Sequence, residues 1–115
     1  MELNPKETAL VLIEFQNDFT SEGGIFYGAV KGVMESSNML TNTVATVKAA
    51  REAGVNIVFV PISFTEDYHE VTPTPYGIMK GVVDNGAFKK NTCASALYPS
   101  LLGTSVDASM ASQSA

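Results

Sequence analysis

The chain has 115 residues, of which 45% are hydrophobic and 17% charged, so it is long enough for one folded domain and too apolar for a disordered protein. Seven basic residues against twelve acidic ones give a net charge of −5, which disfavours a nucleic-acid partner. No apolar run approaches the roughly 20 residues that cross a bilayer, so no membrane partner is expected. The polar residues 1–8 do not resemble a signal peptide, and a single cysteine suits a reducing compartment, so we expect a cytoplasmic protein.

Two short apolar runs, residues 9–13 and 55–62, predict strands buried on both faces, as in a parallel sheet. Between them, residues 33–53 carry apolar side chains at helical spacing, namely Val33, Leu40, Val44 and Val47. Gly54 directly after this segment is a natural helix cap. The order strand, helix, strand predicts a right-handed βαβ unit whose two strands end at the same edge of the sheet.

The remaining segments are less regular. Residues 16–28 and the long polar stretch 63–75 predict loops, and residues 76–88 have a weak helical pattern interrupted by glycines. After Asn91 the only charged residue is Asp107, and residues 93–115 predict a weakly structured, Ser/Ala-rich tail. No third strand is evident, so the sequence predicts an incomplete α/β domain whose open sheet edges favour association with further copies of the chain.

Glu14 is the most informative polar residue, because it directly follows the first predicted strand. The carboxyl ends of parallel strands form the edge at which α/β proteins bind ligands. A partly desolvated carboxylate there can act as a general base, although an ordinary polar residue at a strand end gives the same pattern.

The segment Leu12-Ile13-Glu14-Phe15-Gln16-Asn17-Asp18-Phe19, followed by Glu22-Gly23-Gly24, resembles the opening of the isochorismatase-like cysteine hydrolases. The resemblance continues to about Thr92, so we expect residues 1–92 to be the N-terminal part of such a domain and residues 93–115 to be foreign to it. It implies a three-layer α/β/α fold around a parallel sheet, and hydrolysis of a small amide, ureide or vinyl-ether substrate without a cofactor.

The resemblance also implies a catalytic set of an acid, a lysine and a nucleophilic cysteine, in which Glu14 matches the acid. Here Glu14 stands where the family usually has Asp, no lysine follows a recognisable third strand, and the motif that carries the family's cysteine is absent. We therefore expect a truncated chain that is inactive by itself. Cys93, although close to Lys89 and Lys90, is interpreted as an incidental thiol.

Asp67-Tyr68-His69 matches an Asp-x-His element that nicotinamidases use to bind a metal. His69 is the only histidine of the chain, whereas closed zinc sites need three or four N or S ligands, so we expect no metal site here. The aromatic residues expected to line a substrate pocket are Phe19, Phe64 and Tyr76.

Two other functional classes remain open. The first is a non-catalytic α/β module that associates with itself or with a full-length homologue through its open sheet edges. The second is a receiver-like domain, since Glu14, Asp18 and Glu66-Asp67 place acids near strand ends. A receiver also needs a phosphorylatable Asp on a third strand, which disfavours it.

Overall fold

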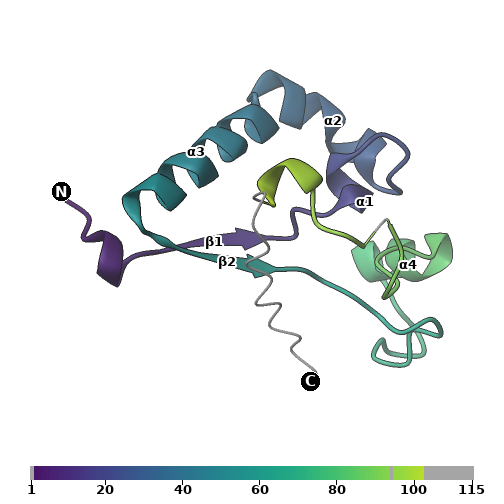
Figure 1. The fold of residues 1–115 in the computed structure, drawn as a ribbon. Helices are drawn as coiled ribbons and strands as arrows, with labels where there is room; N and C mark the ends of the chain where they lie inside the picture. The colour runs from purple at the N-terminus through teal and green to yellow at the C-terminus, as the bar shows by residue number, and fades with distance from the viewer. Residues whose placement is uncertain (1, 94, 103–115) are drawn as a thin grey trace.

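The sheet has two parallel strands, β1 (Ala9–Ile13) and β2 (Asn56–Val60), in a computed structural model that describes residues 2–93 and 95–102. Ala9 lies opposite Asn56 and Ile13 opposite Val60, so the two carboxyl ends meet at one edge (Figure 1). The predicted α/β class and the parallel pairing are confirmed. The second strand is shorter than its apolar run, because residues 61 and 62 continue the chain without regular pairing.

The crossover between the strands contains three helices rather than the single predicted one: α1 (Asn17–Thr20), α2 (Tyr27–Ser36) and α3 (Met39–Ala53). The prediction of one helix over residues 33–53 is wrong. The hydroxyl of Ser37 bonds to the carbonyl oxygen of Val33 at 2.7 Å, and Asn38 takes a left-handed conformation with φ of 50°, which together break the helix. Gly54 ends α3 as predicted, with φ of 76°.

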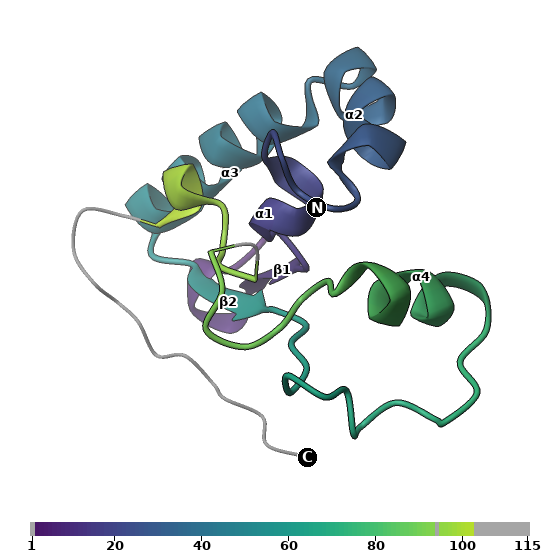
Figure 2. The ribbon, with the colours of Figure 1, turned by 90° about the vertical axis from the view of Figure 1, so that its right-hand side faces the viewer.

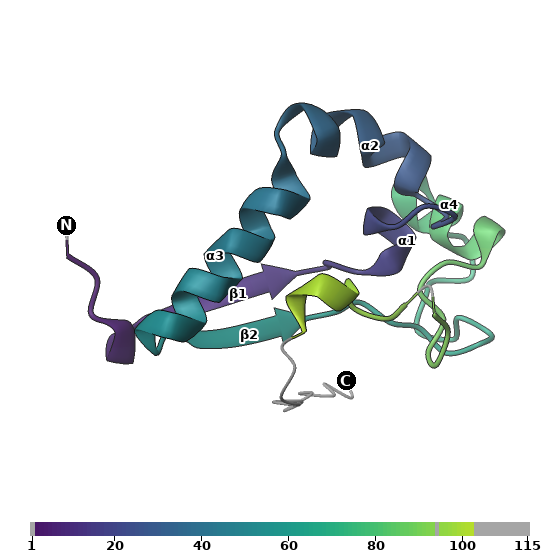
Figure 3. The same cartoon turned by 45° about the horizontal axis from the view of Figure 1, so that its top comes forward.

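Helix α3 covers one face of the sheet and leaves the other bare (Figures 1 and 3). On the covered face, Leu12 packs with Val47 of α3 and with Leu101 in a buried cluster. The alternate side chains of the strands point away from this cluster and are between 40% and 61% exposed; these are Val11, Ile13, Val58 and Val60, which we call the bare face. Within the described residues, the helical layer therefore lies on one side of the sheet only.

A second cluster lies beyond the carboxyl edge, around α4 (Gly77–Asn85), which stands apart from α2 and α3 in Figure 2. Its buried members are Tyr68, Val82, Ala87 and Phe88. The ring of Phe26 stacks on Phe88 with ring centres 5.8 Å apart, and the ring of Phe19 packs against Phe88 at a tilt, with ring centres 5.0 Å apart. This cluster anchors the long loop and α4 to the start of the crossover.

Two 3-10 turns complete the described chain: η1 (Pro5–Glu7) precedes β1, and η2 (Pro99–Leu101) follows the second cluster. Leu101 is fully buried, and its carbonyl oxygen accepts a hydrogen bond of 2.6 Å from Arg51 of α3. Residues 95–102 thus have structure that their composition does not indicate. Residues 103–115, most of the predicted tail, lie outside the described residues. None of the described helices has the length and apolar character needed to cross a membrane.

Candidate active site

Glu14 is the first residue after β1, at the carboxyl edge predicted for it. Its backbone N–H donates to the carbonyl oxygen of Val60 at 2.9 Å, so the acid lies beside the end of β2. Its φ is 60°, a left-handed conformation that costs a non-glycine residue about 1–3 kcal/mol. Such strain is typical of functional positions, and here it turns the chain out of the sheet and leaves the side chain exposed.

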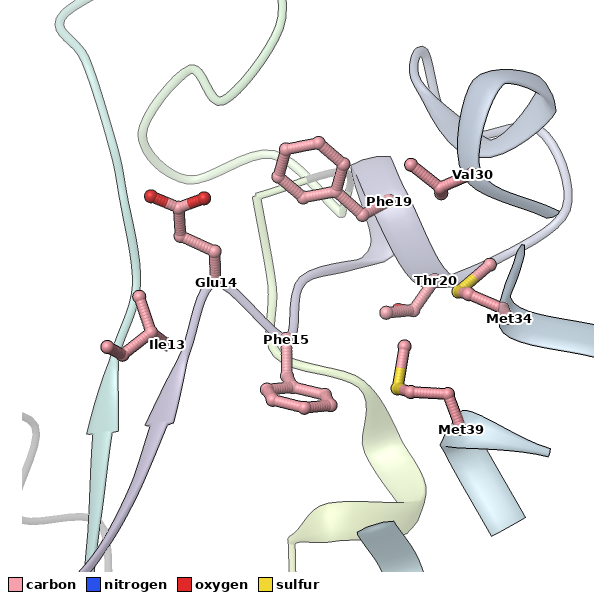
Figure 4. Close-up of a pocket in the computed structure, with 8 residues that line it drawn as sticks. All are labelled: Ile13, Glu14, Phe15, Phe19, Thr20, Val30, Met34 and Met39. Carbon is pink, nitrogen blue, oxygen red and sulfur yellow. The ribbon is translucent and has the colours of Figure 1, made fainter. Parts of the chain in front are cut away.

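A pocket of about 260 Å³ lies beside this turn. Its walls are mostly apolar and come from β1, α1, α2 and the start of α3: Ile13, Glu14, Phe15, Phe19, Thr20, Val30, Met34 and Met39. In Figure 4 the side chains of Glu14 and Phe15 point in opposite directions from the turn. Among the described residues, Glu14 is the single charged residue in this lining, and the other walls are mostly apolar.

The three aromatic residues predicted to line a pocket lie in different environments. Phe19 lines the pocket together with Glu14 (Figure 4). Phe64 packs against the second cluster, with its ring centre 5.6 Å from that of Tyr68. Tyr76 is 84% exposed and precedes α4. The structure therefore brings only Phe19 next to the predicted acid.

Two polar residues that follow Glu14 in the motif lie in the interior of the protein. Gln16 and Asp18 are both fully buried. The Asp18 carboxylate accepts hydrogen bonds from the backbone N–H of Phe88 at 2.8 Å and of Ile25 at 3.3 Å. The Gln16 amide bonds to the backbone of Ile62 and of Ser95. The motif thus ties together segments that are distant in the sequence.

Two lysines lie on a short parallel segment that sequence analysis missed. The N–H of Phe64 donates to the carbonyl oxygen of Phe88 at 2.8 Å, and the N–H of Lys90 donates to that of Phe64 at 2.9 Å. Residues 88–90 therefore run parallel to the chain that follows β2. The one sequence signal is that Phe88 and the two lysines come two to four positions after Gly86, which caps α4, and this run is too short to predict a strand.

The two lysines have different surroundings. The Lys89 ammonium lies over the ring of Tyr68, 5.4 Å from its centre, while Lys90 is exposed. Burial raises the pKa of the Tyr68 hydroxyl above its usual value, and the nearby Asp18 carboxylate raises it further. That hydroxyl donates to the carbonyl oxygen of Ala87 at 2.6 Å. Lys90 is the lysine whose ammonium is open to solvent.

Cys93 is exposed and is not part of the pocket lining. Its carbonyl oxygen accepts a hydrogen bond of 2.8 Å from the side chain of Asn17, three positions after Glu14. This contact brings the backbone of residue 93 close to α1, without placing the thiol in the pocket.

The loop that follows β2 gathers polar side chains around Thr65. Its hydroxyl lies 2.9 Å from Nδ1 of His69 and 2.8 Å from Asp67, and hydrogen bonds from Thr65 and His69 lower the pKa of Asp67. Desolvation raises the pKa of Glu70, but hydrogen bonds from its own backbone and from Thr65 outweigh it, so the net shift is downward. Across residues 2–93 and 95–102, no three His, Cys, Asp or Glu side chains gather as a metal site requires.

The fold and the motif define the class of protein. The isochorismatase domain profile matches residues 8–109, which is most of the chain, so the chain belongs to the isochorismatase-domain family. The matched region includes Glu14 and both lysines, and it extends past residue 92. The predicted resemblance is thereby confirmed, while the division of the chain at residue 92 remains a prediction.

The chain is also similar to individual curated proteins. The chain is 34% identical to the ureidoacrylate amidohydrolase RutB of Agrobacterium fabrum over 68 residues, which are 59% of this chain and 30% of that protein. It is 35% identical over 66 residues to RutB of Cronobacter sakazakii, covering 57% of this chain and 28% of the relative. RutB of Acinetobacter baylyi is 30% identical over 70 residues, 61% of this chain and 29% of the relative. The alignments thus span less than a third of these curated relatives.

Proposed function

We propose that the chain carries the acid-bearing part of a hydrolase site for small amides or ureides, with Glu14 as the proton acceptor. The observation that supports this most is the position of Glu14, strained at the carboxyl end of β1 and lining an apolar pocket with Phe19. A carboxylate with apolar neighbours is suited to general-base work. Of the three substrate classes expected from the sequence, the ureidoacrylate amidohydrolase relatives favour ureides and amides over vinyl ethers.

Lys90 is the proposed cationic partner of the acid. It lies on the segment that runs parallel to the chain after β2, and it is exposed, whereas the ammonium of Lys89 is held over Tyr68. A lysine near the reacting carbonyl stabilises the negative charge that develops there. In this proposal, Lys90 also attracts the carboxylate of an anionic ureide to the neighbourhood of Glu14.

A hydrolase of this kind also needs a nucleophile within reach of its base. Among the described residues, the pocket lining contains no thiol, and its one hydroxyl, that of Thr20, donates to the carbonyl oxygen of Gln16 at 2.9 Å. We therefore propose that the 115-residue chain by itself does not hydrolyse such substrates above background. Groups of a catalytic set act together, so the acid alone leaves little activity.

The test is an assay of the purified chain against ureidoacrylate, simple N-carbamoyl compounds and nicotinamide, beside Glu14→Ala and Cys93→Ser. We expect ammonia release at the background rate in all three proteins. Turnover that disappears in both variants would overturn the proposed inactivity and identify Cys93 as the nucleophile. Turnover that survives Glu14→Ala would overturn the role of the acid.

Binding gives a second measurement that does not depend on turnover. An NMR titration with ureidoacrylate should shift the signals of Phe19 and Met39 at millimolar concentration. Lys90→Ala should weaken this binding several-fold, and Lys89→Ala should leave it unchanged. Equal effects of the two substitutions would contradict the choice of Lys90.

The second candidate function is a non-catalytic module that self-associates, and the bare face of the sheet favours it. Four aliphatic side chains are exposed there on adjacent strands, and parallel sheets are normally covered on both faces. Sedimentation equilibrium over a hundredfold range of protein concentration tests this candidate. A mass that stays at the monomer value throughout would rule it out.

A further inference from the structure

The side chain of Gln16 makes the hydrogen bonds to β2's continuation that the backbone of a longer β1 would make. Its Nε2 donates to the carbonyl oxygen of Ile62 at 2.8 Å, and its Oε1 accepts from the N–H of the same residue at 2.8 Å. The second proton of Nε2 reaches the carbonyl oxygen of Ser95 at 2.7 Å. The side chain is fully buried, and all of these partners are backbone groups.

The register of the sheet explains why Ile62 needs these partners. Glu14 still makes a ladder bond, from its N–H to the carbonyl oxygen of Val60. In an evenly spaced parallel ladder, the next bonds would join Ile62 to the carbonyl oxygen of residue 14 and to the N–H of residue 16. Instead, the N–H of Gln16 turns back and donates to the carbonyl oxygen of Glu14 at 2.8 Å. The side-chain amide therefore satisfies the backbone groups of Ile62 that the turn leaves open.

An amide is the one side-chain group that fits this position. It carries an acceptor and two donors, whereas a carboxylate only accepts and an ammonium only donates. Glutamate at position 16 would face the carbonyl oxygens of Ile62 and Ser95 with a further acceptor. A buried carbonyl without a donor is costly, so the chain would have to rearrange at this edge.

We propose that Gln16 is the positioning residue for Glu14. By taking over the ladder bonds at Ile62, it allows β1 to end at the left-handed turn and holds the acid beside the end of β2. Through Ser95 it also holds the chain that carries Lys90 against the same edge. The inference rests on the proposed role of Glu14 for its functional meaning, while the geometry it describes is tested independently.

The experiment measures the backbone conformation of residue 14 by NMR in isotopically labelled chain. A positive φ gives a strong NOE between the N–H and Hα protons of the same residue and a three-bond coupling distinct from that of a strand. We expect this signature at Glu14 in the parent chain. In Gln16→Glu and in Gln16→Met, it should be replaced by the values of an extended residue.

Asp18→Asn is the matched control, because Asp18 is equally buried and also bonds to distant backbone groups. This variant should lose stability and keep the signature at Glu14. A Gln16 variant that folds and keeps the left-handed signature would overturn the proposal. So would loss of the signature to the same extent in Asp18→Asn.

A measurement on the parent chain covers the case in which the Gln16 variants do not fold. The side-chain amide protons of Gln16 should exchange with solvent at least tenfold more slowly than those of Asn42, whose side chain is exposed. Equal exchange rates would overturn the proposal. A chain without hydrolytic activity but with the expected NMR signature would instead contradict the proposed function alone.

Discussion

The two faces of the sheet are built from the same kinds of residue and have opposite environments. Leu12 and Ile57 contribute to the cluster beneath α3, whereas their sequence neighbours Ile13 and Val58 lie on the bare face. Both strands are therefore apolar enough to be buried on both faces of the sheet. Within the described residues, only one of these faces is covered. Substituting two adjacent residues, one buried and one exposed, therefore measures how much burial contributes to the free energy of unfolding.

The largest expected effect comes from β1. Leu12→Ala removes a side chain that is 4% exposed and contacts α3, and it should lower the free energy of unfolding by about 2–5 kcal/mol. Ile13→Ala, one residue further along on the bare face, should lower it by less than about 1 kcal/mol. Urea denaturation followed by circular dichroism measures both. Equal losses would mean that the bare face is covered in solution.

The end of the described chain offers a second pair. Leu101 is fully buried and its neighbour Leu102 is 51% exposed. Leu101→Ala should cost about 2–3 kcal/mol of stability, because it opens a cavity between α3 and β1, while Leu102→Ala should cost about 0.5 kcal/mol or less. If both substitutions are neutral, residues 99–101 do not pack on the sheet, and the part of the tail that they belong to is weakly structured as the composition indicates.

Local patterns made the regular elements predictable. The apolar run of residues 9–13 corresponds to β1 residue for residue, and Gly54 caps α3 as its position indicates. The break at Asn38 was missed because hydrophobic spacing continues through it, while serine hydroxyls and a left-handed residue end the helix. The packing of Leu101 was missed because its partners, Leu12 and Val47, are distant in the sequence.

For the proposed site, the sequence predicted that Glu14 lies at the carboxyl edge of the sheet, which the structure shows, but it did not predict the residues around it. Glu14 and Phe19 lie together because they are five positions apart on one turn and α1. The segment that carries Lys90, the proposed cationic partner, was not predicted because it makes a single parallel bridge to residue 64, without the apolar run that marks a strand. The role of Gln16 depends on the backbone of Ile62 and Ser95, and such bonds leave no trace in residue spacing.

A third pair, in the second cluster, is Tyr68 and its exposed neighbour His69. Tyr68→Phe removes the bond to Ala87 and should cost about 1 kcal/mol near neutral pH.

Because the pKa of Tyr68 is raised above 10.0 on folding, its contribution is complete below pH 10 and is lost as the pH rises through the folded-state value. The parent chain should therefore lose stability above pH 10 more steeply than Tyr68→Phe. Parallel pH curves for the two proteins would contradict this, and His69→Ala should follow the parent.

The substitution with the smallest expected effect on stability tests whether the bare face makes contacts in solution. Val58→Lys places a charge on an exposed strand position and should change the free energy of unfolding by no more than about 0.5 kcal/mol at low protein concentration. If copies of the chain associate through this face, the same substitution should abolish the rise of the average mass with concentration, since an unpaired charge in an apolar contact is costly. Ala45→Lys, on the exposed side of α3, adds the same charge elsewhere and should leave association unchanged. A loss of several kcal/mol in Val58→Lys at the lowest concentration would show that the face is already covered within a single chain.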